Sequence, residues 1–221
     1  MSYRQTGNKL KIGGTNVTDL QSYQGRLALT IDNSKVDMDQ FDAALVLYAG
    51  TYDNADVTSK ADGVYSKLEV SGRYTASLSQ DRNIVLQTRV RGQLAGSDLD
   101  SFDRISLGGT NGVRAYTSVD GVGEQGGVIS FDLVRKLPYQ QYVGIFYDAG
   151  IVKPFKFPAA GVNNDIYSLQ GAGIQYGINY KQAALAMTLA KGLGSYDGYA
   201  QGNEESSPRN WRGNISLTLN F

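Results

Sequence analysis

The sequence contains neither cysteine nor histidine among its 221 residues. The lack of cysteine excludes a disulfide framework. The lack of histidine removes the most common metal ligand of proteins and most arrangements that activate a catalytic nucleophile. The remaining residues form no catalytic constellation. We therefore expect no enzymatic activity, no metal site and no cofactor.

Two stretches look at first like ligand-binding loops but lack the residues that such loops need. The acidic stretch 53–62 does not have the ligand order of a calcium-binding loop, and we interpret it as a solvated loop. The glycine-rich stretch 108–112 lacks the Gly-Lys-Ser/Thr ending of a phosphate-binding loop.

The sequence also has no run of roughly 18 consecutive apolar residues, the length that a membrane-spanning helix requires. A membrane β-barrel would leave no such run, because its lipid-facing and lumen-facing residues alternate. Basic and acidic residues balance at 21 each, so nothing indicates a nucleic-acid partner. The chain begins Met-Ser-Tyr-Arg, without the charged start and apolar stretch of a secretory leader. For an outer-membrane protein we would therefore expect a mature chain or a fragment.

What the sequence does have is a repeated alternation of apolar and polar residues, the period of a β-strand with unlike sides. A short polar loop is expected around Thr15–Asp19. We expect ten strand segments, the first of them partial, over residues 1–12, 21–32, 41–49, 67–78, 84–94, 129–137, 139–150, 174–180, 185–189 and 211–221.

The polar faces and the connections favour a membrane barrel. One strand carries Arg89 and Arg91 on the same side as two glutamines, and such a face needs water or a polar lumen because unpaired charge is costly in a dry core. From Gln40 onward the connections alternate between long and short, as in a barrel with one rim of tight turns. We predict an antiparallel transmembrane β-barrel. Soluble sandwiches and lipocalin-like barrels use the same alternation and are the alternative.

The stretch 98–127 interrupts this pattern. It has no apolar periodicity and contains seven glycines. A connection of this length is rare in a compact chain unless it is disordered or functional. Phe102, Ile105, Leu107, Val113 and Tyr116 provide apolar anchors that a solvated linker would lack. We therefore expect a folded, functional loop.

Two motifs give the sequence a specific resemblance. A Ser-Leu-Gly-Gly run at 106–109 precedes a Val-Arg-x-Tyr motif, and 144–150 has the pattern Gly-x-Phe-x-Asp-x-Gly. In this order they resemble the sixth surface loop and the barrel-wall motif of two-partner secretion transporters, the hemolysin secretion/activation family within the polypeptide-transporting outer-membrane barrels. The loop residues are Val113, Arg114, Ala115 and Tyr116, and the wall residues are Gly144, Phe146, Asp148 and Gly150.

The resemblance implies that the loop folds back into the barrel lumen and that Arg114 contacts Asp148, with Phe146 and Tyr116 packed around the contact. Arginine suits this contact because its planar fork can bind a carboxylate in two places. Gly144 and Gly150 would permit the close approach of another backbone to the wall. Alanine at position 115, where the wider superfamily commonly has glycine, favours the secretion branch over barrel assembly.

The last strand resembles the terminal signature of outer-membrane barrels, which implies recognition by their insertion machinery. The residues of this signature are Trp211, Leu217, Leu219 and Phe221. The resemblance covers nearly the whole chain, 1–221, and implies the C-terminal portion of a sixteen-stranded barrel that lacks the N-terminal strands and the periplasmic POTRA domains. Such a portion would need to close on itself or to pair with the missing strands or a second copy.

The function implied by the resemblance is that of a bacterial outer-membrane transporter that secretes a large unfolded partner exoprotein. Its partners would be the exoprotein, outer-membrane lipid and the insertion machinery, with no nucleic acid. A small self-closed outer-membrane barrel that acts as a passive pore or structural surface protein is the alternative. Such a pore would conduct ions without a client and would not depend on Arg114.

Overall fold

The computed structural model of the chain describes residues 2–12, 15–33, 39–54, 62–196 and 211–219. Ten strands form one antiparallel sheet, and each pairs with its neighbours in the sequence. The strands of this sheet are β1 (Ser2–Ile12), β2 (Thr15–Asn33), β3 (Gln40–Asn54), β4 (Gly63–Ser77), β5 (Ile84–Ala95), β8 (Gln125–Leu137), β9 (Gln141–Lys153), β10 (Tyr167–Tyr180), β11 (Ala183–Leu193) and β12 (Trp211–Leu219). The all-β prediction with ten strands is confirmed.

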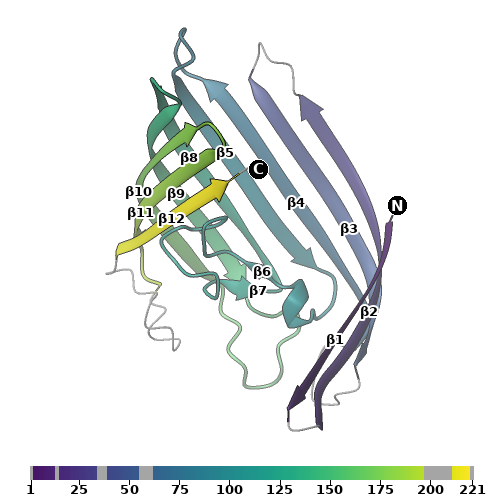
Figure 1. Cartoon of the computed structure of the whole chain (residues 1–221). Helices are drawn as coiled ribbons and strands as arrows, with labels where there is room; N and C mark the ends of the chain where they lie inside the picture. The colour runs from purple at the N-terminus through teal and green to yellow at the C-terminus, as the bar shows by residue number, and fades with distance from the viewer. Residues whose placement is uncertain (1, 13–14, 34–38, 55–61, 197–210, 220–221) are drawn as a thin grey trace.

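The sheet is open and strongly curved (Figure 1). In the part of the chain that the structure describes, β1 and β12 form its two edges and do not pair with each other. The described residues contain no helix of sufficient length and apolar character to cross a membrane. The strands have 9 to 19 residues, against the roughly 9–11 that a tilted strand needs to cross a bilayer.

One prediction about the first hairpin is wrong. Thr15–Asp19, expected as a polar loop, begins β2 and pairs with the end of β1. Polar composition indicated a loop there, but hydrogen bonding to the neighbouring strand decides the conformation. β2 meets β3 only from Leu20 onward, so the first part of β2 has β1 as its single neighbour.

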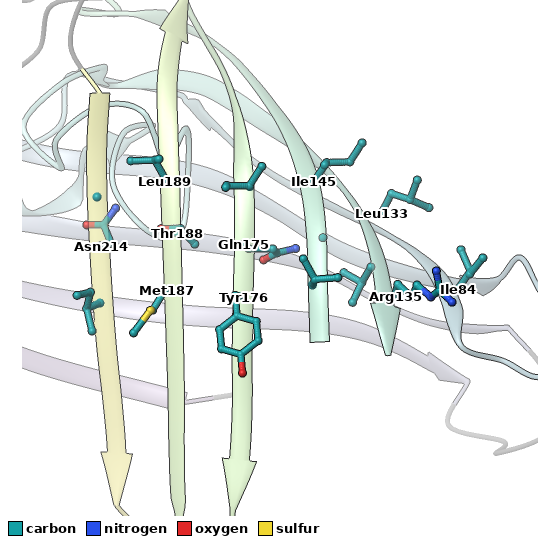
Figure 2. Close-up of a pocket in the computed structure, with 16 residues that line it drawn as sticks. Ile84, Leu133, Arg135, Ile145, Gln175, Tyr176, Met187, Thr188, Leu189 and Asn214 are labelled. Atoms are coloured by element: carbon teal, nitrogen blue, oxygen red, sulfur yellow. The ribbon is translucent and has the colours of Figure 1, made fainter. Parts of the chain in front are cut away.

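The two faces of the sheet differ sharply, as the alternation predicts. Outward side chains are apolar and exposed, and they form one band across all the strands from β2 to β12. This band includes Leu27, Leu29, Ile31, Phe41, Leu45, Leu47, Val70, Val90, Phe131, Leu133, Val143, Ile145, Ile174, Met187, Leu189, Ile215 and Leu217. Across β8 to β12 these side chains line a shallow apolar hollow of about 770 Å³ (Figure 2). A surface of this kind suits hydrocarbon rather than water.

The two rims of the sheet also differ. Among the described connections, 78–83, 138–140 and 181–182 lie at one rim of the sheet, and 96–124 and 154–166 lie at the other. After β8, Pro138 has no N–H to continue the ladder, and Tyr139 and Gln140 both have positive φ angles (59° and 57°). Positive φ at two successive residues gives the tight reversal that returns the chain from Leu137 to Gln141. The alternation of short and long connections is that predicted from the sequence.

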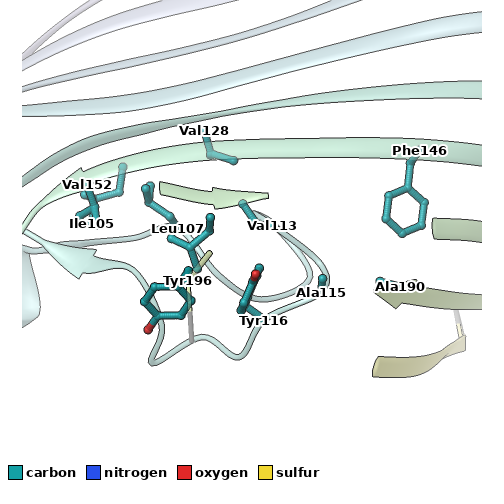
Figure 3. Close-up of a cluster of buried hydrophobic side chains, with 11 residues drawn as sticks. Ile105, Leu107, Val113, Ala115, Tyr116, Val128, Phe146, Val152, Ala190 and Tyr196 are labelled. Carbon is teal, nitrogen blue, oxygen red and sulfur yellow. The ribbon is translucent and has the colours of Figure 1, made fainter. Parts of the chain in front are cut away.

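The 96–124 connection folds back within the curve of the sheet (Figure 1). It contains the 3₁₀ turn η1 (Ser101–Asp103) and two short strands, β6 (Ile105–Ser106) and β7 (Val122–Gly123), that pair with each other. Its apolar side chains pack on the inner face of β8 to β11 and form the main buried cluster of the molecule (Figure 3). Members of this cluster are Ile105, Leu107, Val113, Ala115, Tyr116, Val128, Phe146, Val152, Leu169, Ala190 and Tyr196. We call residues 98–127 the inner segment.

Candidate functional site

The inner segment is folded tightly around its own backbone. The amide of Val113 donates to the carbonyl of Leu107 (2.7 Å), and the amide of Gly109 donates to the carbonyl of Tyr116 (3.0 Å). A Cβ atom on Gly108 would lie 2.0 Å from the carbonyl oxygen of Thr117, which no side chain tolerates. Glycine at this position therefore has a steric reason, since only glycine lets the two backbones approach so closely. The turn presents Arg114 toward the wall of the sheet.

Arg114 is bound to Asp148 by three hydrogen bonds. Its Nε donates to Asp148 Oδ2 (2.9 Å), its Nη2 donates to Oδ1 (2.7 Å), and its backbone N–H donates to Oδ2 (3.0 Å). The guanidinium also stacks on the ring of Phe146 at 3.5 Å from the ring centroid. This is a two-point fork contact, the geometry in which arginine binds carboxylates most strongly.

A second carboxylate completes the contact. Arg114 Nη1 donates to Asp132 Oδ1 at 2.7 Å, and Asp132 also accepts from Arg89 Nη2 (3.0 Å) and Gln175 Nε2 (2.9 Å). Two arginines thus face two aspartates, so the formal charges of the cluster cancel. Arg114 and the two aspartates are each at most 4% exposed.

Burial favours the neutral form of Arg114 and acts to lower the pKa of its guanidinium. The hydrogen bonds and negative charges of Asp148, and then of Asp132, outweigh burial, so this pKa lies above its ordinary value. Arg114 therefore stays charged at any physiological pH. Removal of one partner from such a buried pair leaves an uncompensated charge, and that is the costly event.

Asp103 on η1 fixes the beginning of the inner segment to three strands at once. Its side chain accepts from Tyr52 Oη of β3 (2.7 Å) and pairs with Lys67 Nζ of β4 (3.1 Å). Its backbone carbonyl accepts from Gln93 Nε2 of β5 (2.9 Å). The start of the segment is thereby held against the wall on the opposite side from β10 and β11.

Glu124 fixes the end of the inner segment to a neighbouring connection. The carboxylate is 1% exposed and accepts from the backbone amides of Lys156 (2.6 Å) and Leu99 (3.1 Å). Arg104 Nη2 lies 3.5 Å from the same carboxylate. One side chain therefore joins the two ends of the segment and the 154–166 connection.

Asp120 fixes the tip of the inner segment toward β11. Its Oδ2 accepts from the amide and the hydroxyl of Thr117 (2.8 and 2.6 Å), and its Oδ1 accepts from Tyr196 Oη at 3.1 Å. Burial, followed by the charge and hydrogen bond of Asp120, raises the pKa of Tyr196, so its hydroxyl stays protonated and donates. Tyr196 also stacks on Tyr167, with ring centroids 5.3 Å apart.

None of these clusters is arranged as a cation site. Among the residues that the structure describes, no three or more Asp, Glu, His or Cys side chains are grouped so as to hold a metal ion. The acidic residues of the inner segment instead meet arginine, lysine or N–H and O–H donors of the chain itself. The arrangement is suited to holding a segment in place.

Comparison with known proteins identifies the family. A family model described as haemolysin secretion/activation protein ShlB/FhaC/HecB matches residues 32–175, which is more than half of the chain and includes the inner segment, β8 and β9. The chain belongs to this family. Its members are outer-membrane β-barrel transporters of two-partner secretion, not enzymes, which assigns the chain to the bacterial outer membrane. A search of curated protein sequences gives no match.

Solved structures show the same fold. CdiB from Acinetobacter baumannii is similar with a TM-score of 0.56 and 17% identity, over 98% of this chain and 46% of CdiB. CdiB from Escherichia coli is similar with a TM-score of 0.56 and 13% identity, over 98% of this chain and 49% of CdiB. The chain thus spans about half the length of these CdiB chains.

The structure brings together most of the residues that the sequence singles out. Val113, Ala115 and Tyr116 are buried in the apolar cluster beside Phe146, while Arg114 meets Asp148. Leu107 and Val113 lie within 3.4 Å of where a Cβ of Gly150 would stand, so the segment does approach the wall there. At Gly144 the near atoms are those of Leu133, Val134 and Gln175 in the wall itself, and the inner segment is not among them.

The residues of the terminal signature lie apart from the Arg114 site. Trp211, Leu217 and Leu219 are on the outward face of β12 and are more than half exposed. Trp211 also has the ammonium group of Lys191 at 5.7 Å from its ring. Phe221 lies outside the described residues.

Sequence reasoning missed four acidic residues that hold the inner segment: Asp103, Asp120, Glu124 and Asp132. Asp132 shares the inward side of β8 with Ser130 and is visible in the alternation as a polar wall residue. Its role follows only from strand register, which places it opposite Phe146. The other three lie in irregular backbone, where no period in the sequence indicates their partners.

Replacement of Glu124 by glutamine is expected to loosen the 154–166 connection. The amide keeps one acceptor oxygen but turns an NH₂ group toward the N–H of Leu99 or Lys156, and an unsatisfied buried donor costs about 1–3 kcal/mol. Amide hydrogen exchange at these two residues should accelerate accordingly. Asp165→Asn, an exposed substitution in the same connection, is the control. Equal exchange rates in both variants would contradict the role of Glu124.

Proposed function

We propose that the chain forms the C-terminal part of an outer-membrane transporter that exports an unfolded partner exoprotein. The inner segment is held against the wall by Arg114 in the conformation that export requires. Family membership and the fold support the transport function. The observation that carries the role of Arg114 is its burial between Asp148 and Asp132, with every guanidinium nitrogen hydrogen-bonded to a carboxylate.

The two edges of the sheet support the view that further strands complete the barrel. Backbone groups without partners cost several kcal/mol each in hydrocarbon, and β1 and β12 each lack one neighbour among the described strands. The chain also spans only about half the length of the CdiB structures. Additional strands that pair with both edges would close the sheet around the inner segment.

The test is export by the Arg114→Ala transporter in intact cells. The substitution removes the three side-chain hydrogen bonds to the two aspartates and leaves the one from the backbone N–H to Asp148, without touching the strands. We therefore expect normal insertion into the outer membrane and strongly reduced secretion of the exoprotein. Arg114→Lys should recover little, because an ammonium group cannot make the two-point contact. Arg135→Ala, at an exposed position of β8, is the matched control.

The outcome also separates export from a passive pore. A pore would keep its ion conductance and its surface level in all three variants, and secretion would not respond to Arg114. Unchanged secretion in Arg114→Ala would therefore refute the proposed role of this contact.

A further inference from the structure

The inner face of β4 between Ser71 and Ser77 has a polar surface that none of the anchoring contacts uses. We propose that this surface, which we call the β4 track, contacts an extended polypeptide segment of mixed charge while it is exported. The proposal rests on the export function and specifies where in the barrel the exported chain lies.

Side-chain chemistry along β4 separates its two faces completely. Inward residues from position 67 to 77 are all polar: Lys67, Glu69, Ser71, Arg73, Thr75 and Ser77. The outward residues between them are apolar or glycine. Ser71, Arg73 and Ser77 are exposed, whereas the inward residues Ser130, Asp132 and Asp148 of β8 and β9 are buried beneath the inner segment. The segment thus covers one part of the inner wall and leaves β4 open.

Two hollows follow each other along this face. The first, of about 500 Å³, lies toward the rim of short turns and is lined by Asp42, Arg73, Thr75, Ser77 and Gln87 among others. The second, of about 340 Å³, lies between the wall and the inner segment and is lined by Glu69, Ser71, Arg91 and Phe102 among others. Because Ser71 and Arg73 are successive inward positions, the two hollows are neighbours along one strand.

The charges of the β4 track favour a polypeptide rather than a polyanion. Asp42 stands opposite Arg73 across β3 and β4, and Arg73 stands opposite Arg89 across β4 and β5. Both signs are therefore present at one level of the wall, where a nucleic acid would require a basic surface throughout. A chain that carries both acidic and basic side chains finds partners of either sign there.

The contacts would be weak, as passage requires. The backbone of β4 is already paired with β3 on one side and β5 on the other, so a passing chain cannot add to the sheet as a further strand. Only side-chain contacts remain, in a wet environment where exposed ion pairs contribute little. A path for an exported chain must bind enough to admit it and little enough to release it, as ion-conducting pores do.

Site-specific photo-crosslinking in secreting cells tests the proposal. The photoreactive amino acid p-benzoylphenylalanine is placed in the native transporter at position 71 or 75 of the track. Position 70 on the outward face of the same strand and position 145 on the outward face of β9 are the matched controls. We expect crosslinks to peptides of secreted polypeptides at 71 and 75, at several-fold higher yield than at 70 or 145.

Secretion is measured in the same cells, which separates the two proposals. Normal secretion with no crosslinks at 71 and 75, or with equal yield at 145, would overturn the β4 track and leave export intact. Crosslinks from 71 and 75 to the transporter itself would also overturn it, because another part of the protein would then occupy the track. A transporter without any secretion would instead refute the export function.

Discussion

Replacement of Asp148 by alanine is expected to detach the inner segment from β9, with a loss of about 3–5 kcal/mol in the free energy of docking. The carboxylate accepts three of the four hydrogen bonds that Arg114 makes to the two aspartates, including the one from its backbone amide. Without it, a buried guanidinium would keep only one carboxylate contact. Of the side chains that hold the segment, this one has the largest expected effect.

Limited proteolysis of the detergent-solubilised protein measures this release. Cleavage within 98–127 should be much faster in Asp148→Ala than in the parent protein. Asp132→Ala should show a smaller increase, because Asp132 accepts one bond from Arg114 and its other arginine partner, Arg89, retains 37% side-chain exposure to water. Asp165→Ala, at an exposed position, should leave the cleavage rate unchanged. The order of the three variants is the decisive result, and the reverse order for Asp148 and Asp132 would contradict the geometry.

A valine at position 171 of β10 should displace the inner segment without removing any charge. A Cβ atom there would lie 2.7 Å from Cβ of Ala115, and Val113 Cγ1 is within 3.4 Å. Overpacking of a close contact typically costs about 1–3 kcal/mol, and here the branched side chain meets the loop motif itself. We therefore expect faster cleavage within 98–127 and reduced secretion, although both carboxylates that bind Arg114 are still present.

Gly213→Val provides the matched comparison for Gly171→Val. The nearest atom to a Cβ at position 213 is the carbonyl oxygen of Thr188 at 4.0 Å, so the added side chain has space. Both substitutions replace a strand glycine by valine, but only at position 171 does the new side chain meet the inner segment. If the two variants were cleaved and secreted alike, the packing of the segment on β10 would have no bearing on its docking.

The strands could be predicted because the alternation that indicates them lies within each short stretch of sequence. Alternation along Phe41–Ala49 or Ile129–Leu137 shows which side chains face hydrocarbon, and the structure has strands at both places. The contact between Arg114 and Asp148 was expected only because two compact motifs resemble those of a known family, and no pattern within the chain indicates it. Thr15–Asp19 failed for the opposite reason, since its strand conformation depends on a partner strand rather than on its own composition.

The remainder of the site depends on distances that no local pattern contains. Asp103 reaches Tyr52 across 51 positions, and Asp120 reaches Tyr196 across 76. Gly171 of β10 illustrates the same limit. The sequence shows only a residue with low strand propensity, and the structure shows that glycine is needed there because Ala115 packs directly against it. To predict contacts between a long irregular segment and a distant part of the wall, one must know the register of every strand between them.

The inner segment is tied down at separate places, by Asp103 toward β3 to β5, by Glu124 toward the 154–166 connection and by Asp120 toward Tyr196, with Arg114 between them. If only the Arg114 contact breaks, the contacts of Asp103, Glu124 and Asp120 remain. We then expect the middle of the inner segment to move away from the wall while its two ends stay in place.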